Sequence, residues 1–186
     1  MIYNLFGGVI KVRYVIVSVV NGEAGVFNDN LRQEVFERFG AKSSKLPAHF
    51  TIKAPFEYDG SIYDLEVALE TFSKEPRKEA YAINNYDHFE HRVVYMKLEM
   101  SKEGKGLHDK LIDTIDSLPY IDFHEKDGKN KIFHVTVASK RINNNYSQLW
   151  EYVNTKPCNF QCEFDNVTIY KWQENTWLLH KKYEFM

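Results

Sequence analysis

HFTIKAPF, at residues 49–56, alternates like a half-buried strand, and its first four residues recur as HVTV at 134–137. Side chains alternate between the two faces of a strand, so in each copy the His and the Thr two positions later project from one face. The apolar residues between them then enter a core. The two strands therefore predict one cleft lined by two imidazoles and two hydroxyls: His49, Thr51, His134 and Thr136.

Recurrence by chance is the first alternative to a shared site. The chain has seven His and 44% hydrophobic residues. The probability that the motif occurs twice by chance is then below about 1 in 100. The motif histidines lie 134 − 49 = 85 residues apart, close to half of the 186-residue chain. On the sequence alone, the interpretation of His49 and His134 as structural residues on strand faces stays open.

Charge limits the kind of partner. Lys and Arg number 24 and Asp and Glu 26, so the formal net charge is −2. A protein that binds a long nucleic acid normally carries a basic stripe, because each neutralised phosphate adds affinity through counterion release. We therefore expect a small nucleotide or short RNA end as partner and no extended nucleic-acid footprint. The length favours a single domain over residues 1–186, which we expect to be a monomer.

No stretch near the start resembles a membrane anchor. The apolar run Tyr14–Val20 is seven residues long, whereas a spanning helix needs about 20. Lys11 and Arg13 interrupt the only candidate for a secretory signal in residues 1–13. We expect no membrane contact and a cytoplasmic location.

Two groups of residues raise the question of a metal. Cys158 and Cys162 fall in a predicted strand, too far apart to bridge comfortably, and no second pair completes a zinc site. His88 and His91 fall between two predicted strands and have no obvious third ligand. Reduced core cysteines and a hairpin connection are the favoured interpretations, so we expect no metal and no cofactor.

Periodicity predicts an order of elements that repeats. The first half contains a strand at 14–20, a helix from an Asn28 cap to Phe39, the histidine strand at 48–54, a helix from Ser61 and a strand at 80–86. The second half contains a strand at 92–100, a helix at 105–118, the second histidine strand at 131–139, a helix capped by Ser147, and a hairpin of 159–171 with 176–183.

This repetition predicts two pseudo-symmetric lobes, at about residues 14–86 and 92–186, each of which offers one histidine strand to a shared groove. The expected fold class is α+β, with a mainly antiparallel sheet and flanking helices in each lobe around a central cleft. One continuous sheet is the alternative.

Two H-x-[Ser/Thr]-hydrophobic motifs some eighty residues apart resemble the 2H phosphoesterase superfamily. HFTI at 49–52 and HVTV at 134–137 both fit. The context PAHFTIKAPF, at 47–56, resembles the bacterial branch that contains the RNA 2',3'-cyclic phosphodiesterases, formerly named 2'-5' RNA ligases, and the YjcG-like proteins. The second motif departs from the family in one place, because Phe133 stands where a proline often precedes the histidine.

The resemblance implies a two-lobed fold with both histidines in a central cleft and no metal required. It also implies that His49 and His134 act as general base and general acid on a phosphodiester, and that Thr51 and Thr136 hold the phosphate. Which histidine is the base is not assigned by the sequence. Members of the family act on cyclic nucleotides, ADP-ribose cyclic phosphates and 2'-5' oligonucleotides, so the resemblance leaves the substrate open.

Histidine suits this chemistry independently of the family. An unperturbed pKa of about 6.5 allows one imidazole to be neutral while the other is protonated near physiological pH. Lys53 follows Thr51 by the same period of two, so it could add a cation beside the phosphate, and a solvated lysine at a strand end is the equal alternative. Lys140 and Arg141 could also reach the phosphate, although a charged turn is favoured.

A nucleobase would need an aromatic or apolar platform. Phe56 and Tyr58, just after the first motif, could supply one, with core packing as the alternative.

The sequence thus predicts a metal-independent phosphoesterase that hydrolyses a 2',3'-cyclic phosphate or a related phosphodiester on a nucleotide or short RNA end. A noncatalytic nucleotide or RNA-end binding module is one alternative. The other is 2'-5' ligation of RNA, which would need basic outer surfaces to dock two RNA ends.

Overall fold

The computed structural model describes residues 11–75, 77–124 and 127–186, so residues 1–10 of the segment considered for a secretory signal lie outside it. The strands are β1 (Val12–Val19), β2 (His49–Tyr58), β3 (Glu79–Phe89), β4 (Val93–Met100), β5 (His134–Ala138), β6 (Asn159–Phe164), β7 (Asn166–Gln173) and β8 (Thr176–Glu184). The helices are α1 (Gly22–Phe39), α2 (Tyr63–Ser73), α3 (Lys102–Asp116) and α4 (Tyr146–Asn154), the last preceded by a 3-10 turn, η1 (Asn143–Asn145).

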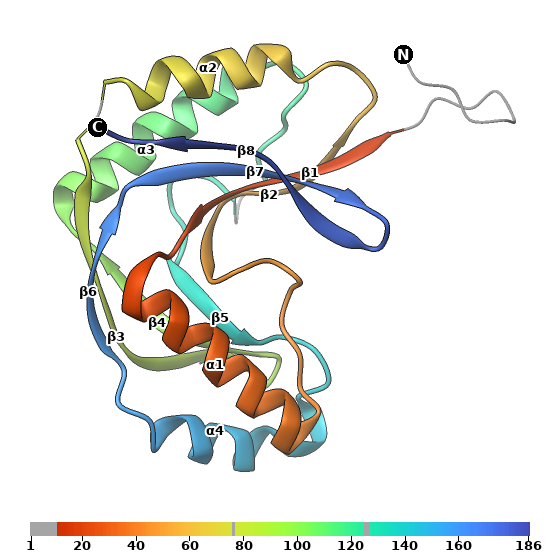
Figure 1. Cartoon of the computed structure of the whole chain (residues 1–186), viewed down its shortest axis with the longest axis vertical. Coiled ribbons are helices and arrows are strands. Elements are labelled where there is room, and N and C mark those ends of the chain that lie inside the picture. The colour runs from red at the N-terminus through yellow and green to blue at the C-terminus, as the bar shows by residue number, and fades with distance from the viewer. Residues whose placement is uncertain (1–10, 76, 125–126) are drawn as a thin grey trace, which may run out of the picture.

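The strands form two four-stranded sheets, in the orders β2-β1-β7-β8 and β5-β4-β3-β6. Every neighbouring pair is antiparallel. Helix α2 lies on the first sheet, α1 and α4 lie on the second, and α3 packs against α2 and contacts one strand of each sheet, β2 and β3 (Figure 1). The α+β class with two antiparallel sheets and flanking helices is therefore confirmed, and each histidine strand is the edge strand of its sheet.

The lobe boundaries expected at 14–86 and 92–186 are wrong. Strand β3 belongs to the second sheet, because the short turn after Phe89 makes it a hairpin with β4. Strands β7 and β8, at the other end of the chain, return to the first sheet beside β1. The expected hairpin arm 159–171 is likewise two strands in different sheets, because the chain crosses from one sheet to the other at Asp165.

A buried asparagine explains where this crossing ends. The Asn166 side chain is fully buried. Its Oδ1 accepts a hydrogen bond from the Val19 amide at 2.9 Å, and its Nδ2 donates to the Val19 carbonyl at 2.8 Å. Asn166 thus bonds the end of β1 as a paired strand would, and β7 starts in register beside it.

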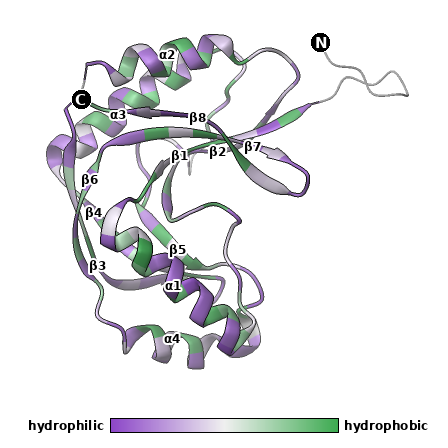
Figure 2. Cartoon of the chain, in the orientation of Figure 1, coloured by the Kyte–Doolittle hydropathy of each residue, from purple (hydrophilic) through white to green (hydrophobic). Residues whose placement is uncertain are grey.

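The main hydrophobic core joins the two sheets. Phe50, between His49 and Thr51, is 1% exposed, and its ring meets those of Tyr81, Phe133 and Phe164 at centroid distances of 5.7, 6.0 and 5.1 Å. Because Phe133 directly precedes His134, the core packing also holds the two motifs near each other. Figure 2 shows how hydrophobic and hydrophilic residues alternate along the strands and around α1 and α4.

Helix α1 begins at Gly22 rather than at the expected cap Asn28. Gly25 lies against the end of β1, where a Cβ would come within 2.2 Å of the Val20 carbonyl oxygen, so the helix can start here only with glycine. Asn28 is instead fully buried, and its Nδ2 donates to the backbone carbonyl of Thr136 at 3.3 Å. A residue expected at a helix end therefore supports the second motif.

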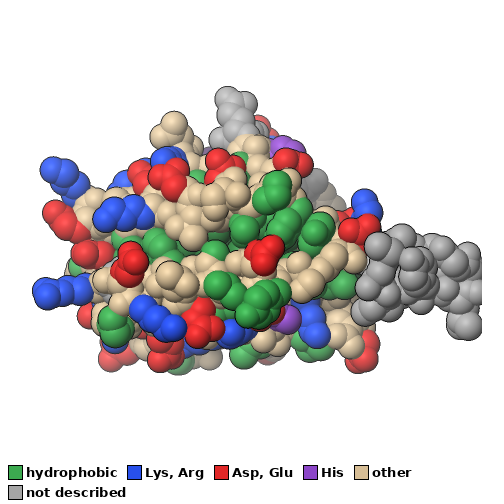
Figure 3. Space-filling model, turned by 90° about the horizontal axis from the view of Figure 1, so that it is seen from above, with side chains coloured by type: hydrophobic (Ala, Val, Ile, Leu, Met, Phe, Trp, Pro, Cys, Tyr) green, Lys and Arg blue, Asp and Glu red, His purple; other side chains and the backbone are tan. Residues whose placement is uncertain are grey.

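The surface mixes charges of both signs. On the face seen in Figure 3, acidic and basic side chains are interspersed, in keeping with the net charge of −2. Within the described ranges, no helix is both long and apolar enough to cross a membrane.

Candidate active site

The two histidine strands run antiparallel to each other where the edges of the two sheets meet. Before β2, the Lys42 amide donates to the Lys140 carbonyl at 2.9 Å, and the Lys140 amide returns a bond of 2.9 Å to the Lys42 carbonyl. At the other end, the Lys131 ammonium donates to the Thr51 carbonyl at 3.1 Å. The segments that lead into and out of the motifs are thus tied at both ends, which sets β2 beside β5.

Burial along both strands follows the expected alternation. In β2, Phe50 and Ile52 are 1% and 0% exposed, while His49 and Thr51 are half-buried. In β5, Val135 and Val137 are fully covered, and His134 and Thr136 are again half-buried. Each motif therefore turns its imidazole and hydroxyl away from the core and toward accessible space.

Both imidazoles are held in the same way. His49 Nδ1 lies 2.6 Å from the carbonyl oxygen of Pro47, and His134 Nδ1 lies 2.9 Å from that of Ile132, in each case the residue two positions earlier. A carbonyl oxygen only accepts, so each Nδ1 carries the proton and donates it. In the neutral ring, Nε2 is then left with a free lone pair, as a base or a proton relay needs.

The environment keeps both rings mostly neutral at pH 7. Burial is the main cause that lowers the pKa of His49 from 6.5 to about 4, and the charges of Arg32 and His134 lower it further. Burial also lowers the pKa of His134, with a contribution from the charge of Lys131. The charge of His134 is the smallest of the causes that act on the pKa of His49, so the two imidazoles interact electrostatically.

Aromatic rings support the second histidine. The imidazole of His134 meets Phe89 edge-on, with centroids 5.1 Å apart, and lies 5.1 Å from Tyr95. Tyr95 is the cross-strand partner of Thr136, so it shares the face of the motif. Together with the Nδ1 hydrogen bond, these contacts fix the ring orientation and leave Nε2 as the free end.

Arg32 is a site residue that the sequence did not reveal. Its guanidinium donates to the carbonyls of Leu46 at 2.9 Å and Ser44 at 2.6 Å, in the segment that leads to the first motif. The next residue, Pro47, is the one whose carbonyl holds His49. Arg32 lies inside helix α1, seventeen positions before His49, so no strand or motif spacing could have connected it to the site.

The expectation that Lys53 shares the face of His49 and Thr51 is wrong. The pairing of β2 with β1 shifts between the Val17–Thr51 pair and the Ile16–Lys53 pair, which marks a β-bulge at Ile52. An inserted residue breaks the period of two, so Lys53 turns to the face of Ile16 and the core. It is 1% exposed, and its ammonium forms an ion pair with the carboxylate of Asp127.

Other residues considered as ligand contacts make structural contacts. Tyr58 stacks on Tyr120 with centroids 4.1 Å apart, and Phe56 lies 5.8 Å from Tyr14. Cys158 and Cys162 are free thiols, as expected, and burial raises the pKa of Cys158 to about 11.

The remaining metal candidates show no ligand cluster. His88 lies near the end of β3 and His91 lies in the turn to β4, so the expected hairpin connection is confirmed. In the part of the chain that the structure describes, no three His, Cys, Asp or Glu side chains are arranged to hold a metal ion.

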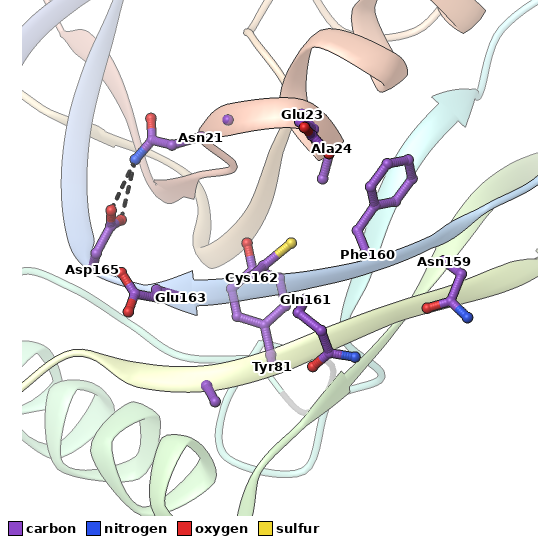
Figure 4. A pocket seen from close by; sticks show the side chains of 12 residues that line it. Asn21, Glu23, Ala24, Tyr81, Asn159, Phe160, Gln161, Cys162, Glu163 and Asp165 are labelled. Atoms are coloured by element: carbon purple, nitrogen blue, oxygen red, sulfur yellow. Dashed lines mark hydrogen bonds between the residues drawn. The ribbon is translucent and has the colours of Figure 1, made fainter.

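A separate pocket of about 770 Å³ lies between the start of α1 and strand β6, away from the motifs (Figure 4). Three carboxylates line it, those of Glu23, Glu163 and Asp165, and Asp165 accepts hydrogen bonds from Asn21. Because this lining is acidic, it repels a phosphate, and the pocket does not compete with the histidine strands as a phosphodiester site.

The fold and the paired motifs together define the class of protein. The sequence model of the 2'-5' RNA ligase superfamily matches residues 28–176, a span that includes both motifs. The chain therefore belongs to the 2'-5' RNA ligase superfamily, a group of 2H phosphoesterase enzymes. No curated protein sequence matches it significantly.

Solved structures share the fold at low sequence identity. TT0787 of Thermus thermophilus is 12% identical, with a TM-score of 0.63 over 93% of this chain and 97% of that one. A crystal structure titled as a phosphoesterase is 13% identical, with a TM-score of 0.58 over 95% and 99%. E. coli LigT complexed with 3'-AMP is 14% identical, with a TM-score of 0.60 over 95% and 99%.

Proposed function

We propose that this enzyme hydrolyses a 2',3'-cyclic phosphate, or a related phosphodiester, on a nucleotide or short RNA end by acid-base catalysis between His49 and His134. The observation that carries the proposal is the matched presentation of the two imidazoles. Both donate from Nδ1 to a carbonyl two residues earlier, and both leave Nε2 free on neighbouring edge strands.

The reaction needs two proton transfers on opposite sides of the phosphorus. One Nε2 takes a proton from water as the new P–O bond forms, and the other imidazolium gives a proton to the ribose oxygen as its P–O bond breaks. Each transfer contributes about 10² to 10⁴ in rate. Because the two motifs are built alike, the orientation of the bound phosphate decides which of them faces the leaving oxygen.

The threonines complete the chemistry. Thr51 and Thr136 follow their histidines on the same strand faces and are half-buried. Their hydroxyls are suited to donate hydrogen bonds to the nonbridging phosphate oxygens, where negative charge is held in the transition state. The phosphate would in turn favour a protonated histidine, which offsets the burial that lowers both histidine pKa values.

A small substrate is supported by charge and by a structural neighbour. The mixed charges in Figure 3 and the net charge of −2 give little basis for gripping a long RNA. E. coli LigT, which shares the fold, has been crystallised with 3'-AMP and with NADP+. We infer a nucleotide-sized ligand here, in the cleft between the histidine strands.

Two other activities are alternatives, and the substrate panel described next distinguishes them from hydrolysis. A noncatalytic nucleotide or RNA-end binding module would bind without turnover, although the presence of both motifs argues against it. RNA ligation by the reverse reaction would need two RNA ends docked at once.

The test is a substrate panel assayed in EDTA: 2',3'-cyclic nucleotides, RNA ends with a cyclic phosphate, ADP-ribose cyclic phosphates and 2'-5' oligonucleotides. We expect turnover of at least one member. His49→Ala and His134→Ala should each lower kcat by at least about 10², with an almost unchanged melting temperature, because each removes a proton-transfer group from a half-buried position. The double variant should be hardly worse than either single one, since base and acid serve one transition state.

Ile52→Ala is the matched control from the other face of the same strand. It removes fully buried methyl groups, so it should cost about 2–5 kcal/mol of unfolding free energy. Folded single histidine variants with wild-type turnover would refute the catalytic assignment. Binding of the panel without turnover would instead support the noncatalytic module.

A further inference from the structure

Behind the histidine faces, a second set of polar groups joins the two motif strands. We call it the polar seam: Asp127 and Lys131 on one side, and residues 51–54 of β2 on the other. Asp127 Oδ1 accepts the Ala54 amide at 2.7 Å, and Asp127 Oδ2 pairs with the ammonium of Lys53. Asp127 and Lys53 are 5% and 1% exposed. The two-histidine mechanism gives none of these groups a role.

Within the polar seam, Lys131 contacts the backbone of the first motif directly. Its ammonium donates to the carbonyl of Thr51 at 3.1 Å and to that of Ile52 at 2.5 Å. Consecutive carbonyls of a regular strand point in opposite directions, so one ammonium can reach both only because the strand bulges at Ile52. As β2 is an edge strand, its outward carbonyls have no neighbouring strand within the sheet, and the half-buried Lys131 supplies a donor for two of them.

The two ends of this contact lie next to the reacting groups. Thr51 belongs to the first motif, and Lys131 lies three residues before His134 in the segment that becomes β5. Phe133, which lies between Lys131 and His134 in the sequence, packs in the core against Phe50. A shift of the Lys131 ammonium would therefore move one motif relative to the other.

We propose that Lys131 is a positioning residue of the two-histidine site, whose bonds to the Thr51 and Ile52 carbonyls set the spacing between the two motifs. This inference rests on the proposed phosphoesterase activity. Catalysis is sensitive to such spacing, because a displacement of about 1 Å at a reacting group can cost about 10² in rate.

Lys131 also acts on its neighbours through its charge. The pKa of His134 therefore reports on Lys131 in a way that a change of packing alone would not. The Lys131 cation lowers the pKa of His134. Asp127 and Lys53 act on Lys131 by charge, and burial lowers the pKa of Lys131 itself to about 8. From α3, His108 also faces it, since the charge of Lys131 lowers the pKa of His108. Removing the cation should therefore raise the pKa of His134.

The test compares Lys131→Met, Lys131→Arg and the control Lys129→Met. Lys129 lies on the same segment but is exposed and pairs with Asp113. We expect Lys131→Met to lower kcat at least about tenfold with KM within about twofold, since the chemical step depends on the spacing. Its His134 pKa, followed by NMR titration, should rise. Lys131→Arg, which keeps charge and donors, should recover much of kcat, and Lys129→Met should match the wild type.

Each outcome of this test either supports or overturns the inference about Lys131. A folded Lys131→Met protein with wild-type kcat and an unchanged His134 titration overturns the inference. If Lys131→Met does not fold, Lys131→Gln, which keeps an N–H donor, replaces it, and an unchanged His134 titration in that variant has the same meaning. If the wild type turns over no member of the panel, the proposed function fails, whereas loss of kcat confined to the Lys131 variants supports the inference.

Discussion

Three histidines of the chain differ in their burial and in their hydrogen bonds. His108 is completely buried and packs edge-on against Phe133 with centroids 4.8 Å apart. Among the described residues, its Nε2 has no hydrogen-bond partner. His49 and His134 are half-buried, and their Nδ1 atoms are bonded to backbone. His108 is therefore a structural histidine, while the exposure of His49 and His134 is compatible with the proton transfer proposed for them.

At this scale we predict a pH profile. The productive state needs one neutral and one protonated imidazole, so kcat/KM should be bell-shaped. Burial lowers both histidine pKa values below 6.5, so as pH rises above 6.5 the free enzyme loses its last imidazolium and kcat/KM should fall. A bound phosphate raises both values, so kcat should fall only at higher pH.

The measurement is initial rate against pH on the best substrate, between pH 4 and 9. The two apparent pKa values of this pH profile belong to the coupled pair of histidines rather than to single residues. A kcat/KM that stays level or rises from pH 6.5 to 8 would contradict the assignment of both histidines as buried, mostly neutral groups.

At the scale of elements, most strands and helices could be predicted, and the misses have local physical causes. The alternation of β2 was readable up to Ile52, where the bulge redirected Lys53. Asparagine favours helix starts, so the sequence predicts Asn28 as a cap, yet Asn28 lies within α1 and bonds the Thr136 carbonyl. Arg32 and Lys131 could not be found, because both act on backbone carbonyls, which carry no sequence pattern.

We predict that Asn166→Ala destabilises the first sheet near His49. The variant leaves the amide and carbonyl of Val19 without their partners in a partly buried place, and each such loss costs up to about 1–3 kcal/mol. Val19 is the cross-strand partner of His49, so activity should also fall.

Asn154→Ala, at the exposed end of α4, is the matched control, and it should change the unfolding free energy by less than about 0.5 kcal/mol. Denaturant titration of both variants measures the difference. Equal stability of the two would show that the Asn166 side chain does not hold the end of β1.

At the scale of the whole molecule, the sequence predicted the class and the pairing of motifs but not the path of the chain. Repeated element order favoured two consecutive lobes, whereas the sheets exchange strands, with β3 in the second and β7 and β8 in the first. The pairing of strands that are distant in the sequence depends on which strand edges meet in the folded chain. The spacing of the strands along the sequence does not determine it. Both histidine strands are nonetheless edge strands, one in each sheet.

We predict a weak salt dependence. With a net charge of −2 and mixed surface charge, only the phosphates at the site should release counterions, and one or two contacts change KM by less than about tenfold between 50 and 200 mM salt. The measurement compares a cyclic mononucleotide with an eight-nucleotide RNA that ends in the same cyclic phosphate. A hundredfold rise of KM for the RNA alone would reveal an extended footprint.

The strand exchange also determines when, during synthesis, the site can exist. Strand β1 lies between the histidine strand β2 and β7, and β7 and β8 occupy residues 166–184, well after both motifs. A ribosome-bound chain that has already exposed both histidines still lacks half of the first sheet. The first sheet can therefore be completed only once residues 166–184 have left the ribosome, so a nascent chain, or one cut before β7, should be unable to hold the first histidine strand in its final place.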